Sequence, residues 1–431
     1  MRVPNRQNKL ILINFFLLIF CSLSLQSVCS KDKPIEVIYW RHNNPPEIDA
    51  MKKLIERFHV LHKEIKITLR TFPYAAYTTK VVATIATGEG PDIINIHNSW
   101  AYGYIKGGLI VPIPEEILAG KTLKKDFFPI LKSFSQHGLY YGLPIGGSNL
   151  ALFYNKRLFR EVNLDAENPP KTWDELLKYG ELLSKRETTT QKILRSGAAI
   201  GLPNGQGWNY FIEGVLRQAG VPIISSDHKR VMWNNADGAA ALKWYMGFIK
   251  ERKVYSHLLP QPYDCFRLNL TAMMINGSWA LGNLEKVLDD HAYKQIGIAP
   301  LPVSSKNIRA TYGTLWGNCV TRTATEKKQK AAWKFIKFIT TYENMKYWAR
   351  STGEIPMRRV VLLDEEFKNK DKKLIPFIEQ MEYAHSSVKK DEKMYQGAIT
   401  EALEQIIYND MTPEKALNRA ARTINLMLEK R

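Results

Sequence analysis

Short apolar runs and longer amphipathic stretches alternate along residues 35–96. The apolar runs predict buried strands, which fall at 35–40, 65–71 and 92–96. Between these runs, apolar side chains recur at helical spacing and predict helices at 47–62 and 80–87. Three strands separated by two helices predict an α/β domain with a mainly parallel sheet.

The alternation continues through the rest of the chain, where the helices carry clear start signals. Thr172 is placed as an N-cap, with Glu175 as its capping-box partner. Amphipathic helices are predicted at 239–250 and 327–340, and a last helix is predicted to open at Pro413 after a threonine cap.

Polar and aromatic residues follow two of the predicted strands directly. Residues 42–44 come after the first strand, and residues 97–100 come after the third. Ligands of open α/β sheets bind in the crevice beyond the carboxyl ends of the strands. We therefore expect these two loops to contribute to a binding site.

The first thirty residues have the order of a secretory signal. Basic residues come first, an apolar run follows at 10–20, and Val28 and Ser30 stand where a signal peptidase needs small side chains. We expect cleavage after Ser30 and a periplasmic protein that begins at Lys31. Two alternatives remain open. The apolar run is short for an uncleaved anchor, which needs about 20 apolar residues, and the residues before Cys29 match a lipoprotein signal poorly.

Composition adds a size, a charge and few cysteines. Without the leader about 400 residues remain, enough for two domains. Lys and Arg number 61 against 42 Asp and Glu, a net charge of +19. The basic residues are spread along the chain, which favours a solvated basic surface over nucleic-acid binding and leaves loose attraction to anionic lipid as an alternative. Beyond the leader only Cys265 and Cys319 remain, and the sequence carries no CxxC or HExxH motif, so we predict no metal or cofactor.

Seven short motifs occur in a fixed order behind the leader. They include the Gly-rich turn before the third strand, "P-x-T-W-x-E-L", "A-M-x-x-x-G-S-W" and "G-x-x-P-x-R", and they fall at 87–94, 143–156, 170–176, 272–279, 299–302, 332–338 and 353–358. In this order the motifs resemble those of the extracellular solute-binding proteins of the sugar-importer type, the relatives of maltose-binding protein. The resemblance runs from Trp40 to about Leu428.

The resemblance implies an α/β, two-lobed periplasmic-binding-protein fold of type II. Each lobe would be a mixed, mainly parallel sheet flanked by helices, and hinge strands would join the lobes. By similarity, lobe one covers 31–143 and 311–357, and lobe two covers 147–308 and 360–431. The hinge crossovers would lie near Pro144, Arg309 and Arg359.

The resemblance also implies a ligand site between the lobes, lined by residues on matching loops. The implied ligand-binding residues are Trp40, His42, Asn43, Asn44, Tyr74, Asn98, Ser99, Trp100, Ser148, Trp208, Tyr210, Trp279, Tyr312, Gly313, Thr314, Trp316 and Arg358. This set is rich in aromatic, amide and hydroxyl groups, which suit the C–H faces and the hydroxyls of a sugar.

Several of these residues have a structural alternative. Trp40 and Trp100 could pack in the core or cap a helix, the asparagines could simply form turns, and Arg358 could pair with Glu354. Trp173 and Trp333 are expected to be structural, and Asp92 is expected to act as a structural hydrogen-bond acceptor. Trp279 is expected to face the ligand, because Gly277 would let the chain turn sharply just before it.

The favoured function is the capture of a sugar or polyol for an ABC importer, by a monomer that works with the importer's membrane subunits. Asn44, Ser99 and Ser148 stand where the maltose binder has carboxylates, which argues against a maltodextrin. A second hypothesis is an organophosphate ligand held by Arg41 and Arg358. A periplasmic glycosidase is a third, but it would need a pair of carboxylates, and Glu47 and Asp264 form no obvious pair.

Overall fold

A computed structural model describes residues 33–118, 123–200, 207–256, 258–389 and 392–429 of the protein. Residues 1–30, which were predicted to be a cleaved leader and include Cys29, lie outside the described residues. Within the described part of the chain, no helix has both the length and the apolar character needed to cross a bilayer.

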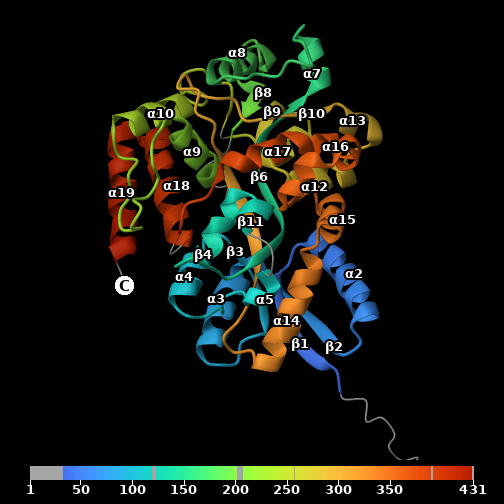
Figure 1. The fold of residues 1–431 in the computed structure, drawn as a ribbon. Helices are drawn as coiled ribbons and strands as arrows, with labels where there is room; N and C mark the ends of the chain where they lie inside the picture. Colours follow the sequence, from blue (N-terminus) through green and yellow to red (C-terminus); the bar gives the residue numbers. More distant parts are fainter. Residues whose placement is uncertain (1–32, 119–122, 201–206, 257, 390–391, 430–431) are drawn as a thin grey trace, which may run out of the picture.

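Most strands form one continuous sheet in the order β2-β1-β3-β11-β6-β9-β8-β7 (Figure 1). Three short strands pair off this path, β10 and β12 with β6 and β13 with β11, and β4 pairs only with β5. The strands are β1 Ile35–His42, β2 Ile65–Phe72, β3 Ile93–His97, β4 Ser135–Gln136, β5 Leu139–Tyr140, β6 Leu143–Asn155, β7 Lys185–Arg186, β8 Ile193–Ala199, β9 Thr271–Gly277, β10 Ile296–Ala299, β11 Thr311–Val320, β12 Ile355–Pro356 and β13 Ala384–His385.

Strand β6 changes partner halfway along its length. Its residues from Leu143 to Asn149 pair antiparallel with β11, whereas those from Leu150 to Tyr154 pair antiparallel with β9. On one side of this switch, β1 pairs parallel with β2 and β3, as the sequence predicts. On the other side, β8 and β9 are parallel, while β7 and β10 pair antiparallel with their neighbours. The sheet is therefore mixed.

Helices cover both ends of the sheet. Those of the first part of the chain are α2 Pro45–Leu61, α3 Tyr74–Ala86, α4 Ala101–Lys106, α5 Glu115–Leu118 and α6 Leu123–Asp126. The middle part contributes α7 Lys156–Glu161, α8 Trp173–Leu183, α9 Gly207–Gln218, α10 Ala236–Gly247, α11 Pro262–Arg267, α12 Trp279–Val287 and α13 Asp290–Lys294. The last part contributes α14 Glu326–Ile339, α15 Tyr342–Thr352, α16 Glu365–Lys370, α17 Ile375–Gln380, α18 Glu392–Asn409 and α19 Pro413–Glu429, besides the 3-10 turns at Pro129–Phe134, Arg359–Leu363, Lys372–Leu374 and Met381–Tyr383.

Segments far apart in the sequence lie side by side in this arrangement. Helix α14 packs on β1 and β11, beside the N-terminal elements coloured blue in Figure 1. Helices α18 and α19 pack on α9 and α10, on the opposite side of the β6 switch. The C-terminal helices therefore complete the part of the molecule that the middle of the chain begins.

Local sequence signals explain most of the element boundaries. The Thr172 side chain accepts a hydrogen bond from the Glu175 N–H, and the Glu175 side chain accepts one from the Thr172 N–H, which confirms the predicted capping box. Helix α19 begins at Pro413, as predicted. Helix α3 is longer than predicted, because its buried face starts with a tyrosine, Tyr77, before the apolar Val81.

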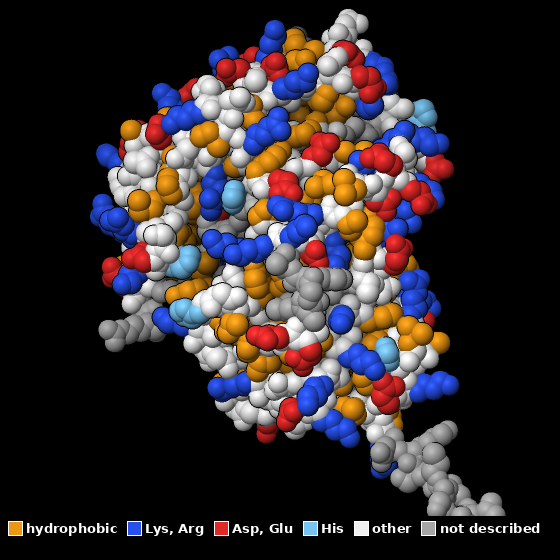
Figure 2. Space-filling view, viewed as in Figure 1, with side chains coloured by type: hydrophobic (Ala, Val, Ile, Leu, Met, Phe, Trp, Pro, Cys, Tyr) orange, Lys and Arg blue, Asp and Glu red, His pale blue; other side chains and the backbone are white. Residues whose placement is uncertain are grey.

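Charged side chains of both signs are dispersed over the face of the molecule drawn in Figure 2. On the face drawn in Figure 2, Lys and Arg lie among Asp and Glu rather than in one continuous basic area. This distribution agrees with the interpretation of the excess positive charge as a solvated surface.

Candidate functional site

Four rings that were predicted to bind the ligand meet at one edge of the sheet, and we call them the aromatic cluster: His42, Tyr74, Trp100 and Trp316. His42 stacks on Trp316 with ring centroids 4.0 Å apart. Trp100 meets Trp316 edge-to-face at 5.3 Å, and Tyr74 lies 5.9 Å from Trp100 and 6.1 Å from Trp316. The cluster forms because the carboxyl ends of β1 and β3 reach the same edge as the start of α3.

Strand β11 presents Trp316 to this cluster through an irregularity. The pairing of β11 with β6 shifts register between Leu315 and Gly317, and Trp316 is the one residue of this strand that is not fully buried. A shift of this kind re-aims a side chain that regular pleating would point elsewhere. The ring is therefore both packed on its neighbours and partly accessible.

A buried histidine, His97, packs against two rings of the cluster. His97 contacts the rings of Trp100 and Trp316, with centroids 5.7 and 5.4 Å away. Its Nε2 lies 2.6 Å from Thr314 Oγ1, and its Nδ1 lies 2.7 Å from Ser99 Oγ. Burial lowers the pKa of His97 to about 4, so the ring is neutral at pH 7. Thr314 and Ser99, both predicted site residues, thus hold His97 in place.

The carboxylate of Glu392, at the start of α18, contacts the cluster and was not predicted from the sequence. Its Oε2 accepts hydrogen bonds from Trp100 Nε1 at 2.7 Å and from the Tyr74 hydroxyl at 3.3 Å. Burial favours the neutral acid, but the charge of His97 when that ring is protonated at low pH, the ammonium group of Lys389 and the two hydrogen bonds outweigh it and lower the pKa of Glu392. Glu392 lies in a run of charged residues that resembles solvated surface, so the sequence carried no signal for this contact.

The segment before α18 is fixed to the same edge of the sheet. The Lys389 N–H donates to the Ser99 carbonyl at 3.1 Å. The Lys389 ammonium group lies over the rings of Tyr312 and Tyr395, 5.0 and 5.1 Å from their centroids, and the residue is 1% exposed. Tyr312 is therefore a buried partner of Lys389 rather than an accessible ring.

A second group of predicted residues lies where β6 meets β9. Ser148 Oγ is 2.7 Å from Ser278 Oγ and accepts a hydrogen bond from the Ser278 N–H. Trp279 begins α12, is half-buried and packs against the hydrophobic core of the protein. The expected role of Gly277 was wrong in its mechanism. Gly277 is not among the positive-φ glycines, and a Cβ there would lie 2.2 Å from the Trp279 ring, so the residue must be small to let the indole pack on the backbone.

Two of the predicted residues are taken up by structure. Trp40 is 6% exposed and packs on Phe72, with centroids 4.7 Å apart, which is the core alternative. The Arg358 guanidinium donates to the Thr340 carbonyl at 2.9 Å and lies 3.5 Å from Asp126. The suggested pairing of Arg358 with Glu354 was therefore wrong.

The other predicted residues are more dispersed. Asn43 is exposed, Asn98 accepts from the Leu315 N–H at 3.3 Å, and a Cβ at Gly313 would collide with Ala384. The side chains of Trp208 and Tyr210, at the start of α9, lie outside the described residues. Three structural expectations are confirmed. The Asp92 side chain accepts a hydrogen bond from the Ile38 N–H at 2.7 Å, and Trp333 is 1% exposed. Trp173, the first residue of α8, donates a hydrogen bond from its indole N–H to the Gln218 side chain at 2.6 Å.

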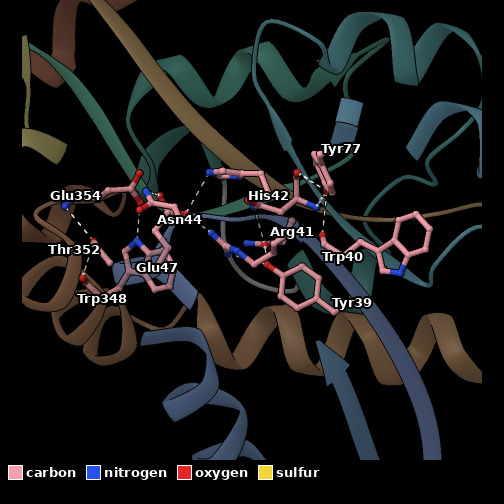
Figure 3. Close-up of polar contacts among 12 residues, drawn as sticks. Tyr39, Trp40, Arg41, His42, Asn44, Glu47, Tyr77, Trp348, Thr352 and Glu354 are labelled. Carbon is pink, nitrogen blue, oxygen red and sulfur yellow. Dashed lines mark hydrogen bonds and ion pairs between the residues drawn. The ribbon is translucent and has the colours of Figure 1, made fainter. Parts of the chain in front are cut away.

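His42 also borders a buried network of charged groups, in which Glu47 Oε2 lies 3.9 Å from His42 Nε2 (Figure 3). Arg41 Nη2 is 2.6 Å from Glu47 Oε2, its Nη1 donates to the Tyr39 hydroxyl, and Asn44 donates to the other oxygen of Glu47 at 2.5 Å. Glu354 accepts from Trp348 Nε1 nearby, and burial together with the negative charge of Glu47 raises its pKa. Arg41 is 1% exposed, so its positive charge is enclosed in the protein and paired with Glu47.

Comparison with known proteins places this geometry in a family. A family model described as bacterial extracellular solute-binding protein matches residues 53–374. The maltotriose-binding protein of Pyrococcus abyssi is 26% identical over 391 residues, which are 87% of this chain and 79% of that protein. The sn-glycerol-3-phosphate-binding periplasmic protein of Pectobacterium atrosepticum is 22% identical and covers 92% of this chain and 91% of its own length.

Solved structures show the same fold. The cyclic alpha-maltosyl-1,6-maltose binding protein of Arthrobacter globiformis superposes with a TM-score of 0.78 at 23% identity, over 92% of this chain and 100% of that one. The sugar-binding protein MalE of Xanthomonas citri gives a TM-score of 0.79 at 19% identity, over 92% of this chain and 98% of that one. The α/β, two-lobed periplasmic-binding-protein fold is thereby confirmed. The chain belongs to the family of bacterial extracellular solute-binding proteins.

Proposed function

We propose that the protein captures a neutral sugar or polyol and delivers it to an ABC importer. The observation that carries this proposal is the aromatic cluster of His42, Tyr74, Trp100 and Trp316, in which the carboxylate of Glu392 accepts hydrogen bonds from two of the rings. Aromatic faces cover the C–H faces of a sugar ring, while a few polar groups hold its hydroxyls. Relatives named for maltotriose and for maltose-type sugars agree with this ligand class.

The glycerol-phosphate-binding relatives make an organophosphate the second candidate. A phosphate needs cations or backbone N–H groups at the site. Arg41 and Arg358, the two cations that the sequence analysis offered, are engaged by Glu47 and Asp126 respectively. The sugar proposal is favoured for this reason.

Binding is proposed to close two lobes around the ligand. The proposed lobes are 31–143 with 311–357 and 147–308 with 360–431, with a crossover near Pro144. Strand β6, which begins at Leu143 and pairs first with β11 and then with β9, supports a passage between the lobes along this strand. Hinge closure is a common response of such proteins to a ligand. Small-angle scattering should show a smaller radius of gyration with ligand, and an unchanged value at saturation would count against closure.

Export and anchoring are also proposals. A cleaved leader ending at Ser30 would leave a periplasmic monomer that meets the membrane subunits of the importer. N-terminal sequencing of protein from the cell envelope should find Lys31 first, and a lipid on Cys29 or an intact Met1 would contradict this. We propose no enzymatic activity, since a glycosidase needs two carboxylates facing one site and Glu47 is occupied by Arg41.

A thermal-shift screen tests the ligand class. The panel holds neutral mono-, di- and trisaccharides, polyols and sn-glycerol 3-phosphate. A ligand at about 100 times its dissociation constant stabilises the protein by about 2.7 kcal/mol, enough to raise the melting temperature visibly. A shift with a neutral sugar or polyol is expected, and a shift with glycerol phosphate alone would overturn the proposal.

A further inference from the structure

Glu392 links helix α18 to two rings of the aromatic cluster. One of its oxygens, Oε2, takes hydrogen bonds from the Trp100 indole at 2.7 Å and from the Tyr74 hydroxyl at 3.3 Å, although Trp100 is 292 residues away in sequence. The other oxygen accepts one bond, from Gln396 on the same helix at 3.2 Å. The carboxylate therefore has a fixed place at the cluster, set by donors from two directions.

This arrangement leaves the carboxylate able to accept more. An ionised carboxyl group has about four acceptor sites and no proton to donate. Three donors are engaged with Glu392: Trp100, Tyr74 and Gln396. A further hydrogen bond must come from a group that carries a proton, and a sugar hydroxyl is such a group. A phosphate or carboxylate oxygen is not, and its negative charge would be repelled.

Three basic residues of this region, Lys389, His97 and Arg41, are buried. The positive charge of Lys389 lowers the pKa of Glu392 and so helps to keep Glu392 ionised. The ammonium group of Lys389 is itself packed over the rings of Tyr312 and Tyr395. His97 is buried and neutral at pH 7. Arg41 forms a buried ion pair with Glu47. Glu392 brings a negative charge into hydrogen-bond contact with two of the predicted ligand-binding rings, Trp100 and Tyr74.

We propose that Glu392 is a specificity-determining residue, which accepts a hydrogen bond from a ligand hydroxyl while it orients Trp100 and Tyr74, and which disfavours anionic ligands. The assignment rests on the proposed function and narrows it to neutral, hydroxyl-rich ligands. It also supplies, from α18, a carboxylate of the kind that the loops at Asn44, Ser99 and Ser148 lack.

The test replaces the charge and keeps the shape, with Glu392→Gln. The probes are maltose, maltotriose, trehalose and sn-glycerol 3-phosphate, titrated calorimetrically into wild type and variant. The matched control is Glu401→Gln, on the same helix, where Glu401 makes a partly exposed ion pair with Arg419. For the best neutral sugar, Glu392→Gln should lose at least about tenfold in affinity, because a charge-assisted acceptor is replaced by a neutral one. The preference for that sugar over glycerol phosphate should shrink, and Glu401→Gln should match wild type.

Melting curves and a second variant separate recognition from folding. Trp100→Phe keeps a ring but removes the N–H that Glu392 accepts, so it too should weaken sugar binding. If wild type prefers a neutral sugar and Glu392→Gln binds it equally well or more tightly, the assignment of Glu392 fails alone. If wild type binds glycerol phosphate in preference to all three sugars, or binds none of the probes, both this inference and the proposed function fail.

Discussion

The imidazole of His42 lies flat on the indole of Trp316, with ring centroids 4.0 Å apart and an interplanar angle of 27°. One ring ends the first strand of the sheet and the other stands at the irregular point of β11. This stack connects the end of β1 with β11, a strand from much later in the chain. A ligand that packs on the Trp316 ring would therefore act on β11 directly and on the end of β1 through His42.

Trp279→Ala tests the contribution of the second half of the sheet. The indole is half-buried on Gly277, so its removal should spare most of the fold and remove stacking surface. Sugar binding should weaken by about 2 kcal/mol or more, while the free energy of unfolding falls by less than the roughly 3–5 kcal/mol of a fully buried Trp.

Trp333→Ala is the control for this variant, because Trp333 is 1% exposed within α14. It should lose stability and keep affinity, as measured by denaturant melts and titration calorimetry. If Trp279→Ala instead collapses in stability while the folded protein binds normally, Trp279 belongs to the core.

Arg41→Gln tests whether the buried arginine is structural. The change leaves Glu47 buried without its cation, so the free energy of unfolding should fall by about 3–5 kcal/mol in urea melts. Arg157→Gln, which breaks an exposed ion pair with Glu161, should cost less than about 1 kcal/mol. Loss of ligand affinity with unchanged stability would mean that Arg41 holds the ligand, as an organophosphate site requires.

His97 should make stability depend on pH in a defined direction. Burial lowers its pKa from 6.5 to about 4. Between these values the unfolded chain binds a proton that the folded protein does not, so the free energy of unfolding decreases as pH falls through this window. His97→Gln should flatten that dependence, and His291→Gln on the exposed helix α13 should leave it as in wild type. Urea melts across the window measure both slopes, and equal slopes in wild type and His97→Gln would refute the assignment.

The sequence predicted those features that depend on neighbouring residues. The capping box at Thr172 and the strand before His42 follow from local spacing, and both are present. Three of the four rings of the cluster could be expected from their place beside strand ends or a proline, and Trp316 came from the family resemblance. Trp40 was ambiguous because a strand end points one residue to the core and the next to the site.

Features that depend on tertiary contacts were not predicted from the sequence. Glu392 meets Trp100 only in the folded chain, where α18 packs on α9 and α19, and no spacing in the chain encodes a contact across 292 residues. The ion pair of Arg41 with Glu47 is local, but its burial depends on Trp348, which packs over the guanidinium from a late helix. Gly277 was expected to permit a turn, yet what it permits is the close packing of a ring.

Titration of the leading neutral sugar into wild type and Trp316→Ala is the most direct test of the aromatic cluster as the binding surface. Trp316 is the least buried residue of β11, so its truncation should leave a folded protein, which a melting curve verifies. We predict a single binding event in wild type and a loss on the order of 2 kcal/mol, roughly thirtyfold in affinity, in Trp316→Ala. Equal affinity of the folded variant and wild type would contradict it.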